Sequence, residues 1–119
     1  MKVVAVSQRE DHVLDRDERR DALDQRLIEI LLAAGYLPIP VPNSLLAQPR
    51  ENNTFTQWIA VVAPTAVVLS GGNDIGTCYR RDMIEIALLA YAERKRLPVL
   101  GICRGMQMMG TRSGSNLHT

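Results

Sequence analysis

The sequence has few aromatic side chains and almost no net charge. It carries one Trp, three Tyr and one Phe in 119 residues, and its 14 Lys and Arg nearly balance its 13 Asp and Glu, for a formal net charge of +1 at pH 7. Proteins that bind nucleic acids use clustered basic residues to neutralise phosphates and aromatic rings on which unpaired bases stack. This chain has neither feature, and we expect no nucleic-acid partner.

Long apolar runs are also missing. The apolar stretch near the N-terminus ends at Val6 and is followed by Ser7, Gln8 and Arg9. It is much shorter than the roughly 20 residues that a membrane-spanning helix needs, and shorter than the apolar region of a secretory signal. The sequence therefore predicts a cytoplasmic protein with no membrane partner.

Cysteine and histidine are scarce, with two of each. Cys78 and Cys103 are enough for one disulfide by count, but a reducing cytoplasm favours free thiols, and only Cys103 lies in a motif. No phosphate-cradling glycine pattern follows the first apolar stretch. We therefore expect no cofactor and assign no metal ligands.

Short apolar stretches alternate with helical patterns along the chain. Strands are predicted at residues 2–6, 36–41, 66–69 and 97–102, and helices at residues 20–34 and 80–96. A further short helix is predicted to begin at a cap formed by Asn53 or Thr54 and to end before Pro64. The charged residues 7–20 are predicted to form a loop. This alternation indicates right-handed βαβ units. The expected fold is α/β, a three-layer sandwich of the flavodoxin-like kind with a mostly parallel sheet.

Two of the predicted strands have distinct expected places in the sheet. Pro38 and Pro40 cannot donate hydrogen bonds within a sheet, which places the strand at 36–41 at an edge. The fully apolar strand at 66–69 is typical of a strand buried on both faces. In the helix at 80–96, the residues expected to face inward are Ile84, Ala87, Leu88 and Tyr91.

The most specific motif surrounds Cys103. Gly101 and Gly105 flank it, and it directly follows an apolar strand, which is the arrangement of a nucleophile elbow between a strand and a helix. The glycines let the backbone turn sharply and expose the central side chain. A thiol at a helix N-terminus is favoured as its thiolate. Cys103 is thus a candidate nucleophile, and the alternative is a small buried side chain.

Two further loops are expected at the same edge of the sheet, because functional loops gather at the carboxyl ends of parallel strands. One follows the first strand, and the other contains Gly71 and Gly72. A thiolate that attacks an amide carbonyl needs hydrogen-bond donors for the developing oxyanion. The backbone N–H of Arg104 and that of Gly72 or Gly71 are candidate donors. The alternative for the glycine pair is an ordinary turn after a strand.

Other polar residues carry weaker signals. Gln107 lies one helical turn beyond Cys103, where its amide could contact a substrate, or it lies on a helix surface. His12 and His118 are the two histidines available as a general base, and a solvated surface histidine is the simpler interpretation of each. Cys78 is assigned no role.

Together these residues make the chain resemble the class I glutamine amidotransferase family, and within it the branch similar to gamma-glutamyl-gamma-aminobutyrate hydrolase. Four stretches carry the resemblance in the expected order, at residues 18–26, 69–75, 79–85 and 98–107. The resemblance implies that Cys103 is the nucleophile and forms a gamma-glutamyl thioester. It implies that Gly72 and Arg104 supply the oxyanion hole. It further implies that Gly71 and Gln107 contribute to binding the glutamyl substrate.

The activity implied by the resemblance is hydrolysis of a gamma-glutamyl amide bond, in glutamine or in a gamma-glutamyl amine, with release of glutamate. Two alternatives stay open. One is a glutaminase that supplies ammonia to a synthetase partner, and the other is a non-catalytic α/β module that binds a partner.

Members of this family complete a Cys-His-Glu triad with a His-x-Glu motif well downstream of the elbow. His118 does not match that motif, because no glutamate follows it. We therefore expect residues 1–119 to be the N-terminal part of one such domain, with little activity alone. Residues 97–102 would then form an exposed apolar edge of the sheet, which favours a homo-oligomer or a partner at that edge.

Overall fold

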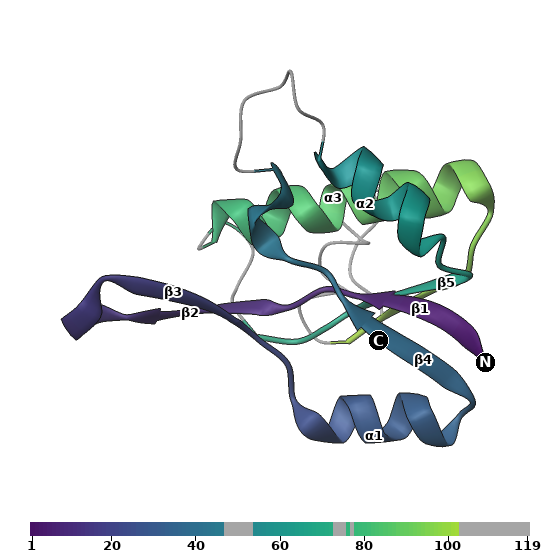
Figure 1. Ribbon diagram of the computed structural model, residues 1–119, viewed down its shortest axis with the longest axis horizontal. Helices are drawn as coiled ribbons and strands as arrows, with labels where there is room; N and C mark the ends of the chain where they lie inside the picture. The colour runs from purple at the N-terminus through teal and green to yellow at the C-terminus, as the bar shows by residue number, and fades with distance from the viewer. Residues whose placement is uncertain (47–53, 73–75, 77, 103–119) are drawn as a thin grey trace.

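A four-stranded sheet with helices on both faces forms the body of the molecule (Figure 1). The computed structural model describes residues 1–46, 54–72, 76 and 78–102. The strands lie in the order β4-β1-β5-β6 and all pair in parallel. Their bounds are Lys2–Val6 for β1, Tyr36–Pro40 for β4, Ala66–Leu69 for β5 and Val99–Gly101 for β6. The predicted parallel sheet is confirmed.

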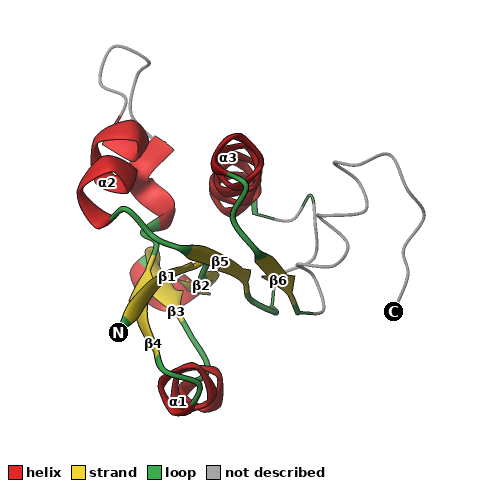
Figure 2. Cartoon of the chain, turned by 90° about the vertical axis from the view of Figure 1, so that its right-hand side faces the viewer, coloured by secondary structure: helices red, strands yellow, loops and turns green. Residues whose placement is uncertain are grey.

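Among the described residues, three α-helices cover the two faces of the sheet. They are α1 (Gln25–Ala33), α2 (Thr54–Val62) and α3 (Tyr79–Lys95). Figure 2 shows α1 on one face and both α2 and α3 on the other. The predicted three-layer α/β sandwich is therefore confirmed. In the part of the chain that the structure describes, no helix is long and apolar enough to cross a membrane.

The core divides into two clusters because neighbouring side chains of a strand point to opposite faces. Ala5, Val67 and Leu69 pack with residues of α2 and α3, including Ile84 and Leu88. The alternate strand residues Val4, Val6 and Val68 pack with Leu31 of α1. All four residues of β5 are buried, as predicted for a strand covered on both faces.

The edge position predicted for the proline-containing strand is confirmed. In β4, Pro38 pairs with Val4 and Pro40 with Val6. Pairing on this one side continues to Val41, whose N–H donates to the carbonyl of Val6 at 2.9 Å. The prolines are tolerated because a parallel edge strand has N–H groups that face outward and need no partner in the sheet.

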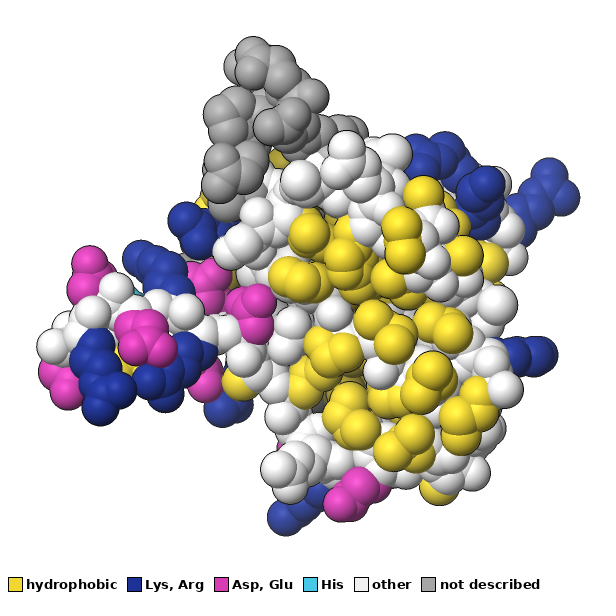
Figure 3. Space-filling model, viewed as in Figure 1, with side chains coloured by type: hydrophobic (Ala, Val, Ile, Leu, Met, Phe, Trp, Pro, Cys, Tyr) yellow, Lys and Arg dark blue, Asp and Glu magenta, His cyan; other side chains and the backbone are white. Residues whose placement is uncertain are grey.

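The charged segment after β1 is not the predicted loop. It forms an antiparallel hairpin of β2 (Arg9–Val13) and β3 (Glu18–Ala22), joined by the 3-10 turn η1 (Leu14–Arg16). The hairpin extends from the sheet, and charged side chains gather on it (Figures 1 and 3). Opposite charges pair across the strands, with 2.9 Å between Arg19 Nη1 and Glu10 Oε1. Because polar residues occupy both faces, the period-two apolar signal of a strand is missing.

Within β3, Arg20 donates from Nε to Glu18 Oε1 at 2.5 Å. This hydrogen bond, with the attraction between the charges, lowers the pKa of the Glu18 carboxyl and raises the pKa of Arg20. Both side chains are about half exposed to solvent, so the pair adds little to stability.

The first helix begins at Gln25 and not near Arg20 as predicted. Asp24 has extended backbone angles and its carboxylate accepts a hydrogen bond from the N–H of Arg26 at 2.8 Å, which is the arrangement of an N-cap. The cap fixes where the helix starts, and it releases residues 18–22 to pair in the hairpin. For α2, the predicted alternative cap Asn53 lies outside the described residues.

Helix α3 matches its predicted range within one residue. Ile84 and Leu88 are fully buried, and Ala87 and Tyr91 pack partly buried against the same cluster, as predicted. The buried face also holds Arg81 and Glu85, which the apolar pattern did not predict. The last described strand, β6, lies at one edge of the described sheet, and Leu100 is about half exposed there. Association of a second copy or a partner at this edge stays a prediction.

Candidate active site

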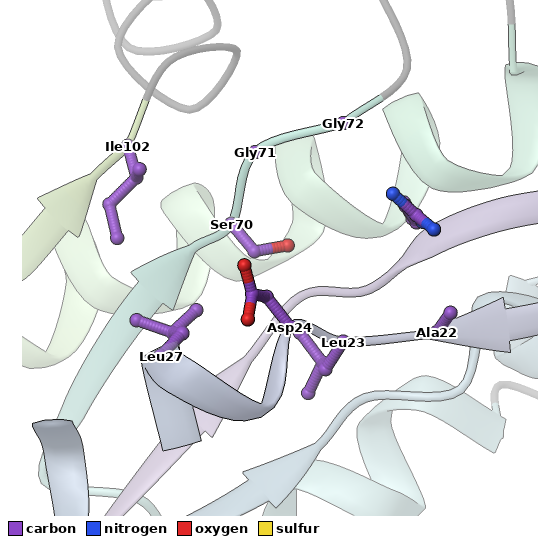
Figure 4. A pocket seen from close by; sticks show the side chains of 9 residues that line it. Ala22, Leu23, Asp24, Leu27, Ser70, Gly71, Gly72 and Ile102 are labelled. Atoms are coloured by element: carbon purple, nitrogen blue, oxygen red, sulfur yellow. The ribbon is translucent and has the colours of Figure 1, made fainter. Parts of the chain in front are cut away.

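The predicted nucleophile Cys103 lies outside the described residues, as do Arg104 and Gln107. The described chain does extend to position 102. There the N–H of Ile102 donates to the carbonyl of Leu69 at 2.9 Å, one residue beyond the pairing of Leu69 with Gly101. The residue before Cys103 therefore lies beside the end of β5, where the loop of residues 70–72 begins (Figure 4).

Gly72 occupies a position that only glycine fits. Its φ of +115° lies in the range that favours glycine. A Cβ atom at this position would stand 2.7 Å from Cβ of Arg9 and 2.9 Å from Nη1 of Arg81. The first of these atoms is bound directly to the β2 backbone and cannot move away cheaply. The backbone of the loop therefore packs tightly against Arg9 and Arg81 at Gly72.

A pocket of about 290 Å³ lies beside this loop, which forms part of its lining (Figure 4). Its apolar walls are Leu23, Leu27 and Ile102, and its charged groups are Arg9 and Asp24. The backbone of residues 70–72 closes the side nearest β5. The pocket thus joins three segments that the sequence places far apart: the segment after β1, the glycine loop and the end of β6. The segment after β1 and the glycine loop thus meet at the carboxyl edge of the sheet, as expected, and the elbow itself lies outside the described residues.

Beneath the glycine loop lies a buried polar network that the sequence did not reveal. Ser7, Ser70, Arg81 and Glu85 are each at most 3% exposed. The Ser7 hydroxyl donates to Glu85 Oε2 at 2.6 Å and accepts from the Ser70 N–H at 2.9 Å. The Ser70 hydroxyl donates to the Ser7 carbonyl at 2.6 Å. These bonds tie the ends of β1 and β5 to α3.

A signal for this network was present in the sequence. Arg81 and Glu85 are four residues apart and lie at helical spacing from Ile84 and Leu88, so two opposite charges adjoin the residues that were predicted to face inward. Buried charges are stable only when they are paired and hydrogen-bonded. Two opposite charges beside a predicted inward face therefore indicate a buried polar network.

The candidate base His12 lies elsewhere, as does Cys78, which was assigned no role. Cys78 is buried at the N-terminus of α3, and its Sγ donates to Glu10 Oε2 at 3.3 Å, away from the residues that line the pocket. His12 lies in the hairpin, 3.1 Å from Asp17 Oδ1. His118 lies outside the described residues. Among the residues that are described, no group of three or more His, Cys, Asp or Glu is placed to hold a metal ion.

Comparison with known proteins decides the family of this chain. Residues 2–119 match the sequence model of peptidase C26. The chain belongs to the peptidase C26 family. The resemblance to class I glutamine amidotransferases, and to the branch similar to gamma-glutamyl-gamma-aminobutyrate hydrolase, is thereby confirmed.

Curated relatives agree with this assignment to the C26 family. A gamma-glutamyl-gamma-aminobutyrate hydrolase of Escherichia coli O157:H7 is 27% identical over 103 residues, which covers 81% of this chain and 41% of the relative. A glutamine amidotransferase-like protein of Rickettsia prowazekii is 28% identical over 103 residues, covering 74% of this chain and 34% of the relative. A gamma-glutamyl-CDP-amidate hydrolase of Campylobacter jejuni is 40% identical over 50 residues, covering 37% of this chain and 25% of the relative. This C26 chain thus spans about two fifths of the length of the first of these relatives.

Proposed function

We propose that the gene product containing this chain hydrolyses gamma-glutamyl amide bonds, in glutamine or in a gamma-glutamyl amine. The family supports a hydrolase that acts on gamma-glutamyl compounds. The observation that carries the proposal furthest is the hydrogen bond from Ile102 to Leu69, because it holds the residue before Cys103 beside the end of β5, where the glycine loop begins.

The proposed reaction has two steps. The Sγ of Cys103 forms a bond to the gamma-carbonyl carbon, the C–N bond breaks, and ammonia or an amine leaves with a proton. A water molecule then attacks the thioester carbonyl and the C–S bond breaks. Glutamate is released and the Cys103 thiol is regenerated. The histidine and glutamate that the family resemblance implies would move these protons, and we assign no residue of the described part to that role.

Gly72 and Arg104 are the proposed donors to the oxyanion formed in each step. Each would donate from its backbone N–H. Such a donor stabilises the developing oxyanion effectively when it is held in place before the reaction. Gly71 and Gln107 are proposed to contact the glutamyl group.

The pocket chemistry also suits a gamma-glutamyl substrate. The glutamyl group has methylenes between its amide and an end that carries both an ammonium and a carboxylate. Leu23, Leu27 and Ile102 offer apolar contact for the methylenes, and Asp24 and Arg9 offer one charge of each sign for the ionic end.

Glutamate release tests the proposed function. The full gene product is incubated with glutamine, with gamma-glutamyl-gamma-aminobutyrate and, as a matched control, with isoglutamine, whose amide is on the alpha-carboxyl. We expect glutamate from at least one gamma-linked substrate and none from the control. Equal release from both linkages, or release from neither, would contradict the proposal. Release from glutamine only after a synthetase is added would favour an ammonia-supplying role.

A further inference from the structure

The strongest unassigned feature of the molecule is the buried ion pair beneath the glycine loop. The side chains of Arg81 and Glu85 are both 0% exposed, and Arg81 Nη2 lies 3.4 Å from Glu85 Oε2. Removing two charges from water costs several kcal/mol per ion, and the attraction between them often fails to recover that cost. A well-packed apolar pair would fill the same space with less penalty. The charges therefore need an explanation beyond stability.

The guanidinium of Arg81 is directed at the backbone of the glycine loop. Its Nη2 lies 2.5 Å from the carbonyl oxygen of Ser70 and 3.1 Å from the carbonyl oxygen of Gly71, with Ser70 Oγ at 3.2 Å. A single nitrogen atom thus binds two consecutive carbonyls of the loop. Arg81 Nη1 is also the atom that a Cβ at position 72 would meet at 2.9 Å.

These contacts fix the direction of one peptide group. The carbonyl of Gly71 and the N–H of Gly72 belong to the same peptide bond, and in a planar trans peptide they point in opposite directions. No described peptide bond of the chain is cis. Because Arg81 binds the Gly71 carbonyl from the side of α3, the Gly72 N–H points away from α3. Gly71 and Gly72 line the pocket, whereas no residue of α3 does.

The charge has a second effect on the same peptide. A cation bound to a carbonyl polarises the amide, which makes its N–H a stronger donor, and this effect is largest where the dielectric constant is low. Glu85 neutralises the cation in the folded state and is itself held by the Ser7 hydroxyl at 2.6 Å. The ion pair is therefore fixed to the ends of β1 and β5 at once.

We propose that Arg81, held by Glu85, is a positioning residue that directs and polarises the Gly71–Gly72 peptide so that the Gly72 N–H serves as an oxyanion donor. The proposal rests on the proposed function. Arg81 acts through the loop and touches neither the substrate nor Cys103 in this account. Its loss should weaken stabilisation of the transition state while leaving substrate binding nearly unchanged.

The test compares kcat and KM of the wild-type gene product with those of the double variant Arg81→Met, Glu85→Gln. This variant removes both charges together, so no unpaired charge stays buried, and glutamine still accepts from Ser7. We expect kcat to fall about a hundredfold, as when an oxyanion donor is lost, with KM changed less than about threefold. Arg80→Met, one residue away on the exposed side of α3, is the matched control and should keep wild-type kcat.

A second readout separates positioning from general damage to the fold. Alkylation of Cys103 by iodoacetamide forms no oxyanion, so its rate should be the same in the wild type and the double variant. If the double variant does not fold, Arg81→Lys decides instead. Lysine keeps the charge, but its ammonium ends one bond short of the position of Arg81 Nη2, and we expect about a tenfold fall in kcat with normal alkylation.

Three outcomes overturn the inference, and they differ from one another. A folded double variant with wild-type kcat shows that Arg81 does not position the donor. Equal losses in kcat and in the alkylation rate show a structural role only. Absence of gamma-glutamyl hydrolysis by the wild type removes the proposed function itself, and the inference fails with it.

Discussion

Replacing Cys103 with alanine is expected to lower kcat for glutamate release by about a millionfold. In enzymes with a nucleophile and a base, loss of the nucleophile alone costs about as much as loss of the whole catalytic set. The residual rate would come from binding and from the oxyanion donors, which the substitution leaves in place. Initial rates of glutamate formation at saturating gamma-glutamyl substrate measure the effect.

The second cysteine provides the matched control for this prediction. Cys78 is buried and donates from Sγ to Glu10 Oε2 at 3.3 Å, and serine keeps a donor of similar size at that position. Cys78→Ser should therefore retain kcat within about threefold. Turnover that survives in Cys103→Ala, or that is lost equally in Cys78→Ser, would show that Cys103 is not the nucleophile.

Gly72→Ala is expected to lower kcat by about a hundredfold or more. The alanine Cβ would stand 2.7 Å from Arg9 Cβ, and the φ of +115° disfavours any L side chain. Both effects push the backbone away from its position, and an oxyanion donor loses its value when displaced. Steady-state kinetics with a gamma-glutamyl amide, together with a thermal unfolding midpoint for each variant, measure the change.

Gly76 gives a control that isolates backbone strain from displacement of the loop. It also has a positive φ, +91°, but a Cβ there would meet nothing within 4 Å. Gly76→Ala should lose about 1–2 kcal/mol of stability from strain and keep its kcat. If the two alanine variants lose stability and kcat to the same extent, Gly72 has no role beyond its turn.

The strands and helices of the sandwich were predictable because their signals are local. The apolar stretch at 66–69 is buried throughout, and the prolines at 38 and 40 correctly indicated an edge position for their strand. These patterns are informative because a fully apolar strand is stable where both of its faces are covered, and a strand with prolines is stable at an edge of the sheet. The β2–β3 hairpin was missed for the converse reason: both of its faces are polar, and its pairing depends on charges that a loop would carry equally well.

The candidate site was predictable only in part. Gly71 and Gly72 were recognised from their place after a strand, and the structure adds the close approach of Arg9 and Arg81 that makes Gly72 irreplaceable. The buried pair of Arg81 and Glu85 was missed because charged helical residues are usually exposed, and only the three-dimensional packing shows which ones are not. The pocket was likewise invisible, since it is built by segments from three separate parts of the chain.

The central claim is that Cys103 carries a gamma-glutamyl thioester during turnover. The most direct test is the mass of the protein after acid quenching of a reaction with a gamma-glutamyl amide, followed by mapping of the modified peptide. We expect the mass of one added gamma-glutamyl group, located on Cys103, absent from Cys103→Ala and removed by hydroxylamine. Glutamate release with no such adduct on Cys103, or with the adduct on Cys78, would contradict it.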